Sequence, residues 1–328
     1  MKKRSLHKML ALGLMLATAS VPHVAAKTNF NLVGKQMLIM LRNSHYERLN
    51  IDDLGVRFFD TYIKSLDGNK QYFLASDIDM FRAKYGTNLH ELLLAEQCMT
   101  PAEEIYNLYR ERANDRIKYA QELLEDDSSF TFESDREVIL DREKAEWPVS
   151  DEEAKQIWKD QVEQALLSEF LRRESVADLA AKQGKADPLK DKKLPGEMIS
   201  LRYERILKSI NSADEEDIAD RFFSAIAKSY DPHTDYFSMS EMERFMAGMK
   251  NSLVGIGALL QAEDDGSTKI TGIVVGGPAD KEGSLKLNDR VVGVDHTNAG
   301  TEEAVVDIMF EKLDRVVDMI RGKEGVDV

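Results

Sequence analysis

Cysteine is almost absent from this sequence, which contains Cys98 alone among its 328 residues. A single cysteine cannot form an internal disulfide, so hydrophobic cores alone must hold the fold together. The sequence also lacks any His-x-x-x-His pattern or paired cysteines, which are the usual marks of a structural zinc site. We therefore expect no metal and no cofactor.

Positive charge is scarce as well. Lysine and arginine number 44 against 59 aspartates and glutamates, and the formal net charge is −15. So acidic a chain repels phosphate backbones, and a nucleic acid is not an expected partner. Long apolar runs are also lacking. The one run near the N-terminus is too short to span a bilayer and has the length of a signal-peptide core.

The first 26 residues have the organisation of a secretory signal. A basic head precedes the apolar run, and Val24 and Ala26 have the spacing of a small-residue cleavage site. We expect cleavage after Ala26, which removes four basic and no acidic residues and takes the net charge from −15 to −19. This predicts a soluble periplasmic protein of a Gram-negative bacterium. An uncleaved membrane anchor is the alternative.

The rest of the chain divides in two. Residues 27–250 show helical periodicity, with capping boxes predicted at residues 100–103, 150–153 and 212–215. Residues 251–328 begin with short apolar runs rich in glycine and valine, which predict strands, and continue into a helical stretch over residues 302–322. The predicted fold class is α+β: a mostly helical domain followed by a small β-rich domain.

The stretch KSYDPHTDYF, at residues 228–237, raises the question of catalysis because it places His233 between Asp231 and Asp235. Residues 64–81 align with residues 228–245 without gaps, and this upstream copy has no histidine in the place of His233. We therefore interpret the repeat as structural, with Asp67 and Asp231 accepting hydrogen bonds from turn amides. A hydrolase that uses His233 is the alternative. His45 is expected to begin a helical segment and to be half-buried.

The sequence GIGA, at residues 255–258, opens the first predicted strand. Two glycines around one apolar residue let consecutive N–H groups point the same way, and such a nest binds an anion, typically a carboxylate. If the following strand is an open edge, a peptide can add beside it. A tight turn without a ligand is the commoner explanation of Gly-x-Gly.

The context of this motif resembles a PDZ domain. GIGA stands in the place of the carboxylate-binding loop, GGPADKEGSLKLNDRVVGVD resembles the turn, short helix and strand that follow, and LDRVVDMIRG resembles the helix beside the groove. Residues 321–325 look like the turn into the last strand, so the domain is expected to be incomplete at residue 328.

A broader resemblance covers nearly all of the mature chain. DPHTDYFS followed by GIGA is similar to the arrangement in C-terminal processing peptidases, and SHY and LDGNKQYFLASDI resemble the tail-specific protease branch (Prc/Tsp type). Members of this family hydrolyse peptides with a serine–lysine dyad in a core that follows the PDZ domain. We find no match to that core in this chain and expect no catalytic residues in it. A stand-alone periplasmic binding or adaptor protein is the alternative.

The resemblance implies that the β-rich domain binds the nonpolar C-terminal tails of periplasmic proteins, and an adaptor protein is a further expected partner. The backbone amides that would hold the terminal carboxylate are those of Ile256, Gly257 and Ala258. The side chains that would line the peptide groove are those of Leu260, Leu313, Val316 and Val317.

Overall fold

A computed structural model describes most of the chain: residues 28–46, 49, 51–125, 130–133, 137–190, 192–239, 241–242, 245–246, 255–263, 266–295, 304–309 and 311–321. The predicted signal peptide, the boundary predicted at residue 250, and the predicted turn beyond residue 321 lie outside these residues.

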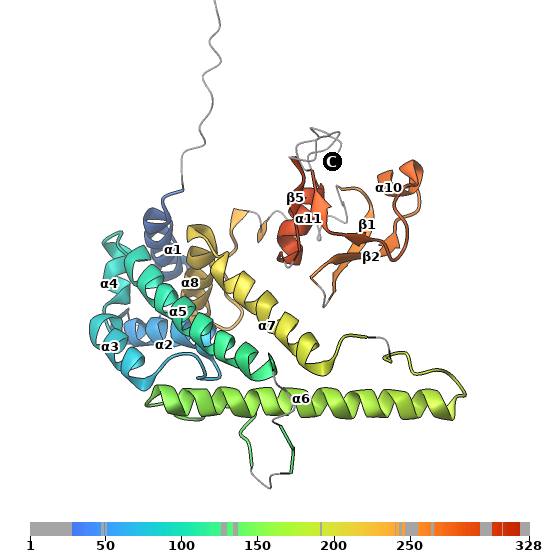
Figure 1. The fold of residues 1–328 in the computed structure, drawn as a ribbon. Helices are drawn as coiled ribbons and strands as arrows, with labels where there is room; N and C mark the ends of the chain where they lie inside the picture. The colour runs from blue at the N-terminus through green and yellow to red at the C-terminus, as the bar shows by residue number, and fades with distance from the viewer. Residues whose placement is uncertain are drawn as a thin grey trace, which may run out of the picture.

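The N-terminal part is helical, as the periodicity predicts (Figure 1). Its helices are α1 (Phe30–Ser44), α2 (Ile51–Asp67), α3 (Ala75–Tyr85), α4 (Leu89–Leu94), α5 (Met99–Glu125), α6 (Asp151–Lys182), α7 (Pro195–Asn211) and α8 (Glu215–Tyr230). Helices α2 and α8 pack against each other, and α5 packs against α6, α7 and α8.

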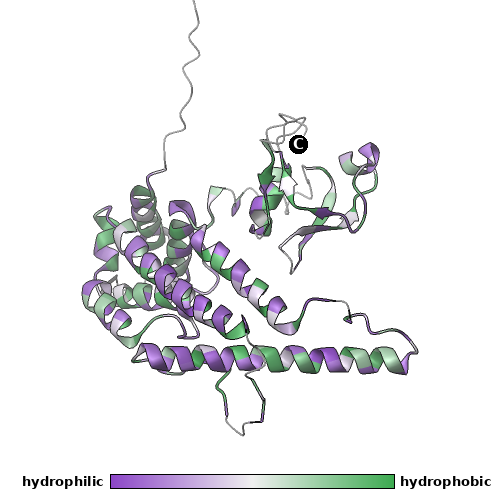
Figure 2. Ribbon diagram, in the orientation of Figure 1, coloured by the Kyte–Doolittle hydropathy of each residue, from purple (hydrophilic) through white to green (hydrophobic). Residues whose placement is uncertain are grey.

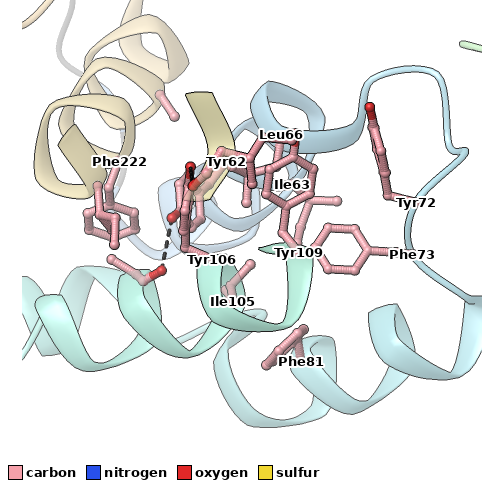
Figure 3. Close-up of a cluster of buried hydrophobic side chains, with 14 of the residues drawn as sticks. Tyr62, Ile63, Leu66, Tyr72, Phe73, Phe81, Ile105, Tyr106, Tyr109 and Phe222 are labelled. Atoms are coloured by element: carbon pink, nitrogen blue, oxygen red, sulfur yellow. Dashed lines mark hydrogen bonds between the residues drawn. The ribbon is translucent and has the colours of Figure 1, made fainter. Parts of the chain in front are cut away.

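Aromatic side chains fill the core of this helical part. Tyr62 is fully buried, its ring packs edge-on against Phe222 at 4.9 Å, and its hydroxyl donates to the carbonyl of Ala102 at 2.9 Å (Figure 3). Burial raises the pKa of Tyr62 far above its ordinary value, so the phenol stays neutral. The hydrogen bond satisfies the one polar group that this side chain brings into the core.

Helix α6 joins this core through its first half only. Trp158 is buried and its indole N–H donates to the carbonyl of Gln71 at 2.8 Å, while Val162 and Leu166 are fully buried on the same side. Phe170, which the helical spacing places on the same stripe, is 41% exposed. Hydrophilic and hydrophobic residues still alternate along the second half of α6 (Figure 2).

Two of the predicted helix starts can be compared directly. The helix start predicted at residues 150–153 is confirmed, because the Glu153 N–H donates to Ser150 Oγ at 3.2 Å at the start of α6. The Glu153 carboxylate accepts the Val149 N–H at 2.9 Å in place of the Ser150 N–H, so only the first half of the capping box forms. The box at residues 212–215 is wrong. Asp214 caps α8 instead, accepting the Asp217 N–H at 3.0 Å, while Ser212 ends α7. Ser212 and Asp214 are both residue types that cap helices, but Ser212 is the C-cap of α7, so Asp214 becomes the cap of α8.

The box predicted at residues 100–103 is also wrong, because α5 begins one residue earlier, at Met99. The Met99 N–H donates to Asn31 Oδ1 at 2.9 Å, and Asn31 lies on α1. A side chain distant in sequence thus satisfies the first amide of α5, and Pro101, which lacks an N–H, fits within the first turn.

The internal repeat is visible as two packed copies of one helix–turn–helix unit. The match extends upstream of residues 64 and 228, because Arg57-Phe58-Phe59 corresponds to Arg221-Phe222-Phe223. Ser229 Oγ donates to the carbonyl of Arg57 at 3.3 Å, and Arg221 Nη1 donates to the carbonyl of Ser65 at 3.3 Å. Equivalent residues thus make reciprocal contacts, which indicates a pseudo-twofold relation between α2 and α8.

The C-terminal part is a small module of short elements. They are β1 (Ala258–Ala262), β2 (Thr268–Ile273), α10 (Pro278–Glu282), β3 (Arg290–Val291), β4 (Gly293–Val294), β5 (Val306–Asp307) and α11 (Leu313–Arg321). One antiparallel sheet has the order β1-β2-β3, and β4 pairs with β5. The described residues are therefore mostly helical with a small β-rich region, in agreement with the predicted α+β class.

The helix predicted over residues 302–322 is correct only in its second half. Val306 pairs with Val294 in β5, and the Ile308 N–H donates to the carbonyl of Val292 at 3.0 Å. Ile308 is fully buried in a cluster with Val294, Val316 and Ile320. A β-branched segment that reaches a partner strand and a core forms a strand, and local helix propensity does not prevent it.

Candidate functional site

The GIGA loop is held to the module from two sides. The carbonyl of Gly257 accepts the Val274 N–H at 2.8 Å, and the carbonyl of Ile256 accepts the Ala279 N–H at 2.8 Å. Gly257 has φ +78°, a conformation that favours glycine, and a Cβ there would lie 3.3 Å from the Cα of Gly277. The loop is thus anchored at the end of β2 and at α10, and it turns in a way that a side chain would strain.

Among the strands of the described residues, β1 lies at the end of its sheet. It pairs antiparallel with β2 and is the first strand in the order β1-β2-β3, with a register shift between Leu259 and Leu260. Because the bond between Gly257 and Val274 faces β2, strand alternation directs the N–H of Ala258 toward the opposite, outer edge. Helix α11 contacts β1. A strand edge beside a helix, next to a glycine turn, is an arrangement that can accept an extended peptide.

The side chains expected to line the groove differ in accessibility. Val316 is fully buried in the module core, so it does not offer a surface to a ligand. Leu260 is half-buried and packs against that core, while Leu313 and Val317 are also half-buried. Of the two valines of α11 that were expected at the groove, Val316 thus supports the module from inside, and Val317 remains partly accessible.

The Asp231 turn forms a small polar cluster with the end of α1. His45 Nε2 lies 3.1 Å from Thr234 Oγ1 and 3.9 Å from Asp231 Oδ2. His45 follows the last residue of α1 and its N–H donates to the carbonyl of Leu41, so the prediction that it begins a helix is wrong. No spacing rule could have paired residues so far apart in the chain, because folding alone brings them together.

Asp231 itself acts as a turn acceptor, as expected. It accepts the His233 N–H at 3.2 Å and the Thr234 hydroxyl at 3.2 Å. The His233 N–H bond is the main reason why the pKa of Asp231 lies below its ordinary value. The His233 side chain is 92% exposed, and its contact is with Asp231. This geometry is that of a hydrogen-bonded turn.

Asp67, the equivalent residue in the first copy, is bound more tightly. Its Oδ1 accepts the Gln71 N–H at 2.8 Å, and its Oδ2 accepts the N–H groups of Tyr72 and Phe73, each at 2.9 Å. The side chain is 2% exposed. The prediction that both aspartates accept turn amides is therefore confirmed, with three amides in the first copy.

Sequence reasoning missed a charged contact between the helical part and the module. Lys312 Nζ lies 3.2 Å from Asp217 Oδ1, and Arg315 Nη2 lies 3.3 Å from Asp214 Oδ2. Asp214 is the N-cap of α8 and Asp217 lies in its first turn, while Lys312 immediately precedes α11 and Arg315 lies in its first turn. The acidic residues at the start of α8 were visible in the sequence, but the sequence did not indicate which basic residues would form ion pairs with them.

A cavity of about 780 Å³ adjoins this contact, lined by residues of α2, α5, α8 and α11. Asp220 lies in its wall, and burial raises the pKa of this carboxyl to about 7, with Glu241 and Glu216 adding to the rise. Asp220 Oδ1 is buried and has no hydrogen-bond partner within the described part of the chain. The cavity wall carries charges of both signs, since lysines and arginines of α2, α8 and α11 line it beside the acidic residues.

The described residues contain neither a membrane-spanning helix nor a metal-binding cluster. No helix there has the length and apolar character needed to cross a membrane. No group of three or more histidine, cysteine, aspartate or glutamate side chains is placed there to hold a metal ion.

Comparison with known proteins identifies the family. The family model described as the tail specific protease N-terminal domain matches residues 37–240. The chain is 31% identical over 310 residues to the "Tail-specific protease" of Haemophilus influenzae, covering 94% of this chain and 41% of that protein. It is 32% identical over 98 residues to a "Probable CtpA-like serine protease" of Staphylococcus epidermidis, covering 30% of this chain and 18% of that protein.

The chain thus spans about two fifths of the length of its Haemophilus relative. The family match covers α2 to α8, the first copy of the repeat and the second copy as far as residue 240, and the similarity to the Haemophilus protein extends over most of the remaining residues. This chain belongs to the tail-specific protease family.

Proposed function

We propose that this chain is the substrate-recognising portion of a periplasmic tail-specific serine peptidase, and that its module binds the apolar C-terminal tails of proteins destined for proteolysis. The observation that carries the proposal is the anchored GIGA loop at the start of β1, an edge strand that lies against α11. The names of the relatives, which are proteases, agree with this role.

The loop would provide the carboxylate site. The N–H groups of Ile256, Gly257 and Ala258 would donate to the terminal carboxylate, and hydrogen bonds to a charged acceptor are stronger than neutral ones. The peptide backbone would then pair with the outer edge of β1, as peptides do in PDZ domains. This gives the module a PDZ-like mode of binding, in which the C-terminal carboxylate of the peptide is the main recognised group.

Side chains at the edge would select apolar tails. Leu260, Leu313 and Val317 are half-buried, so a small or apolar terminal residue would cover surface that they leave exposed. The net charge of the chain disfavours strongly acidic tails. Because an ordered peptide loses conformational entropy, we expect micromolar affinity, or about −8 kcal/mol.

The test compares peptides that differ only at the terminus. A peptide ending in Leu-Ala with a free carboxylate is titrated against the chain by calorimetry, in parallel with its amidated form. We expect the free acid to bind at least tenfold more tightly, because amidation removes the charge that the amides recognise. Equal affinities would contradict the carboxylate site.

The loop is tested by two matched glycine variants. Gly257 and Gly276 have φ +78° and +80°, but a Cβ on Gly276 would meet no atom within 4 Å. Gly257→Val should abolish binding because it distorts the loop at the carboxylate site, whereas Gly276→Val carries a similar backbone strain and should retain binding. Thermal melts of both variants separate lost binding from lost folding.

A further inference from the structure

The two copies of the internal repeat differ in how well their apolar residues are covered. Three apolar positions after the turn are conserved in character between the copies. Phe73, Ile78 and Phe81 of the first copy are 0%, 4% and 4% exposed, and their counterparts Phe237, Met242 and Phe245 are 41%, 42% and 49% exposed. The second copy therefore presents to solvent a face that the first copy buries.

Helix α5 is a main cover of the first copy. The rings of Phe73 and Tyr109 lie 6.0 Å apart, and Phe81 belongs to the same buried cluster as Ile105 of that helix. An ion pair accompanies this apolar contact, because Arg112 of α5 binds both carboxylate oxygens of Asp77 at 2.9 Å. The first copy thus binds an amphipathic helix through an apolar stripe and one bidentate arginine.

The second copy retains the acid that receives this arginine. Glu241 occupies the place of Asp77, and its Oε2 accepts the Ser238 N–H at 3.2 Å, as Asp77 accepts the Leu74 N–H at 2.9 Å. Within the described residues, however, Glu241 has no basic partner corresponding to Arg112. The first copy therefore has an arginine paired with its acidic residue, and the described part of the second copy does not.

The cavity beside Glu241 carries charges of both signs, with lysines and arginines of α2, α8 and α11 among its lining residues. Glu241 lines the 780 Å³ cavity together with Glu216 and Asp220, and the proximity of these carboxylates contributes to the raised pKa of Asp220. On the apolar side, Phe237 and Phe245 stack on each other with ring centroids 5.6 Å apart, and they remain 41% and 49% exposed. In both copies, therefore, an equivalent acidic side chain lies between the same two phenylalanine positions in the sequence.

We propose that Phe237, Glu241, Met242 and Phe245, here called the second-copy face, bind an amphipathic helix of a protein partner in the way that the first copy binds α5. The partner helix presents aromatic or aliphatic residues to the apolar part and an arginine to Glu241. This surface is separate from the edge of β1, so the inference does not depend on tail binding.

The probe for the test is a fluorescently labelled peptide with the sequence of α5, residues 99–125, titrated against the whole 328-residue chain and followed by anisotropy. We expect saturable binding that Phe245→Asp weakens at least tenfold. Met80→Asp is the matched control, because Met80 is also apolar and 50% exposed but lies on α3 in the first copy. It should leave binding unchanged.

Charge exchange tests the arginine contact. A peptide carrying Arg112→Glu should bind the native chain at least fivefold more weakly, and Glu241→Arg in the chain should restore its affinity. Binding that Phe245→Asp leaves unchanged would overturn the proposal, since the peptide would then be replacing the chain's own α5. Failure to bind, or a dimer of the native chain that Phe245→Asp dissociates, would overturn it as well.

Discussion

Replacing Asp67 by alanine should destabilise the helical part far more than the same change at Asp231. Asp67 is 2% exposed and accepts three backbone N–H groups, those of Gln71, Tyr72 and Phe73, at 2.8–2.9 Å. Asp231, in the equivalent turn, accepts one backbone N–H, that of His233, at 3.2 Å. Removing Asp67 therefore leaves three amides without an acceptor, against one for Asp231.

The size of the loss follows from where these amides lie. Gln71 is half-buried, so water can replace its lost acceptor, whereas Tyr72 and Phe73 are buried. Each buried donor left unsatisfied costs about 1–3 kcal/mol, so Asp67→Ala should lower the free energy of unfolding by roughly 3–5 kcal/mol. This is a large part of the roughly 5–15 kcal/mol that stabilises a typical domain.

Urea denaturation followed by circular dichroism measures the effect. Asp67→Asn should give an intermediate loss, because one oxygen remains while the amide NH₂ faces a backbone N–H. Neither aspartate variant should change peptide affinity where the chain remains folded. The reasoning is refuted if Asp67→Ala costs no more than Asp231→Ala, or if Asp231→Ala abolishes peptide binding while leaving stability unchanged.

Three further predictions concern a buried acid, a helix cap and catalysis. Burial raises the pKa of Asp220 to about 7, above its unfolded value, so the ionised carboxylate disfavours folding above pH 7 and this penalty fades as the pH falls toward 4. Asp220→Asn should therefore stabilise the chain at pH 8 by roughly 1 kcal/mol after solvent screening. Thermal melts across this pH range should show that the stabilisation vanishes near pH 4. Ser150→Ala removes the cap of α6 and should cost about 1 kcal/mol in urea titrations, and an unchanged midpoint would mean that Glu153 alone secures this helix start. The polypeptide of these 328 residues should not cleave an unfolded protein with an apolar tail, as followed by mass spectrometry, and cleavage that disappears in His233→Ala would reverse our interpretation of the Asp231 turn.

Patterns within a few residues of each other were sufficient for much of this protein. The helical period predicted that the N-terminal part is helical, and Ser150 with Glu153 predicted the start of α6, because a cap is formed by side chains and amides within one turn. The glycines of GIGA predicted a turn into a strand, and Gly257 adopts the positive φ that such a turn requires. These features depend on local sterics and hydrogen bonds, so the sequence determines them.

Contacts between distant segments were decided by the tertiary structure alone. Asn31 sets the start of α5, and a partner strand with a core position for Ile308 makes a strand where helical propensity is strong. The repeat shows the same limit, because Phe81 and Phe245 occupy equivalent places in similar sequences, yet one is buried and the other is half-exposed. Burial depends on which element arrives to cover a side chain, and that element lies elsewhere in the chain, beyond the reach of local patterns.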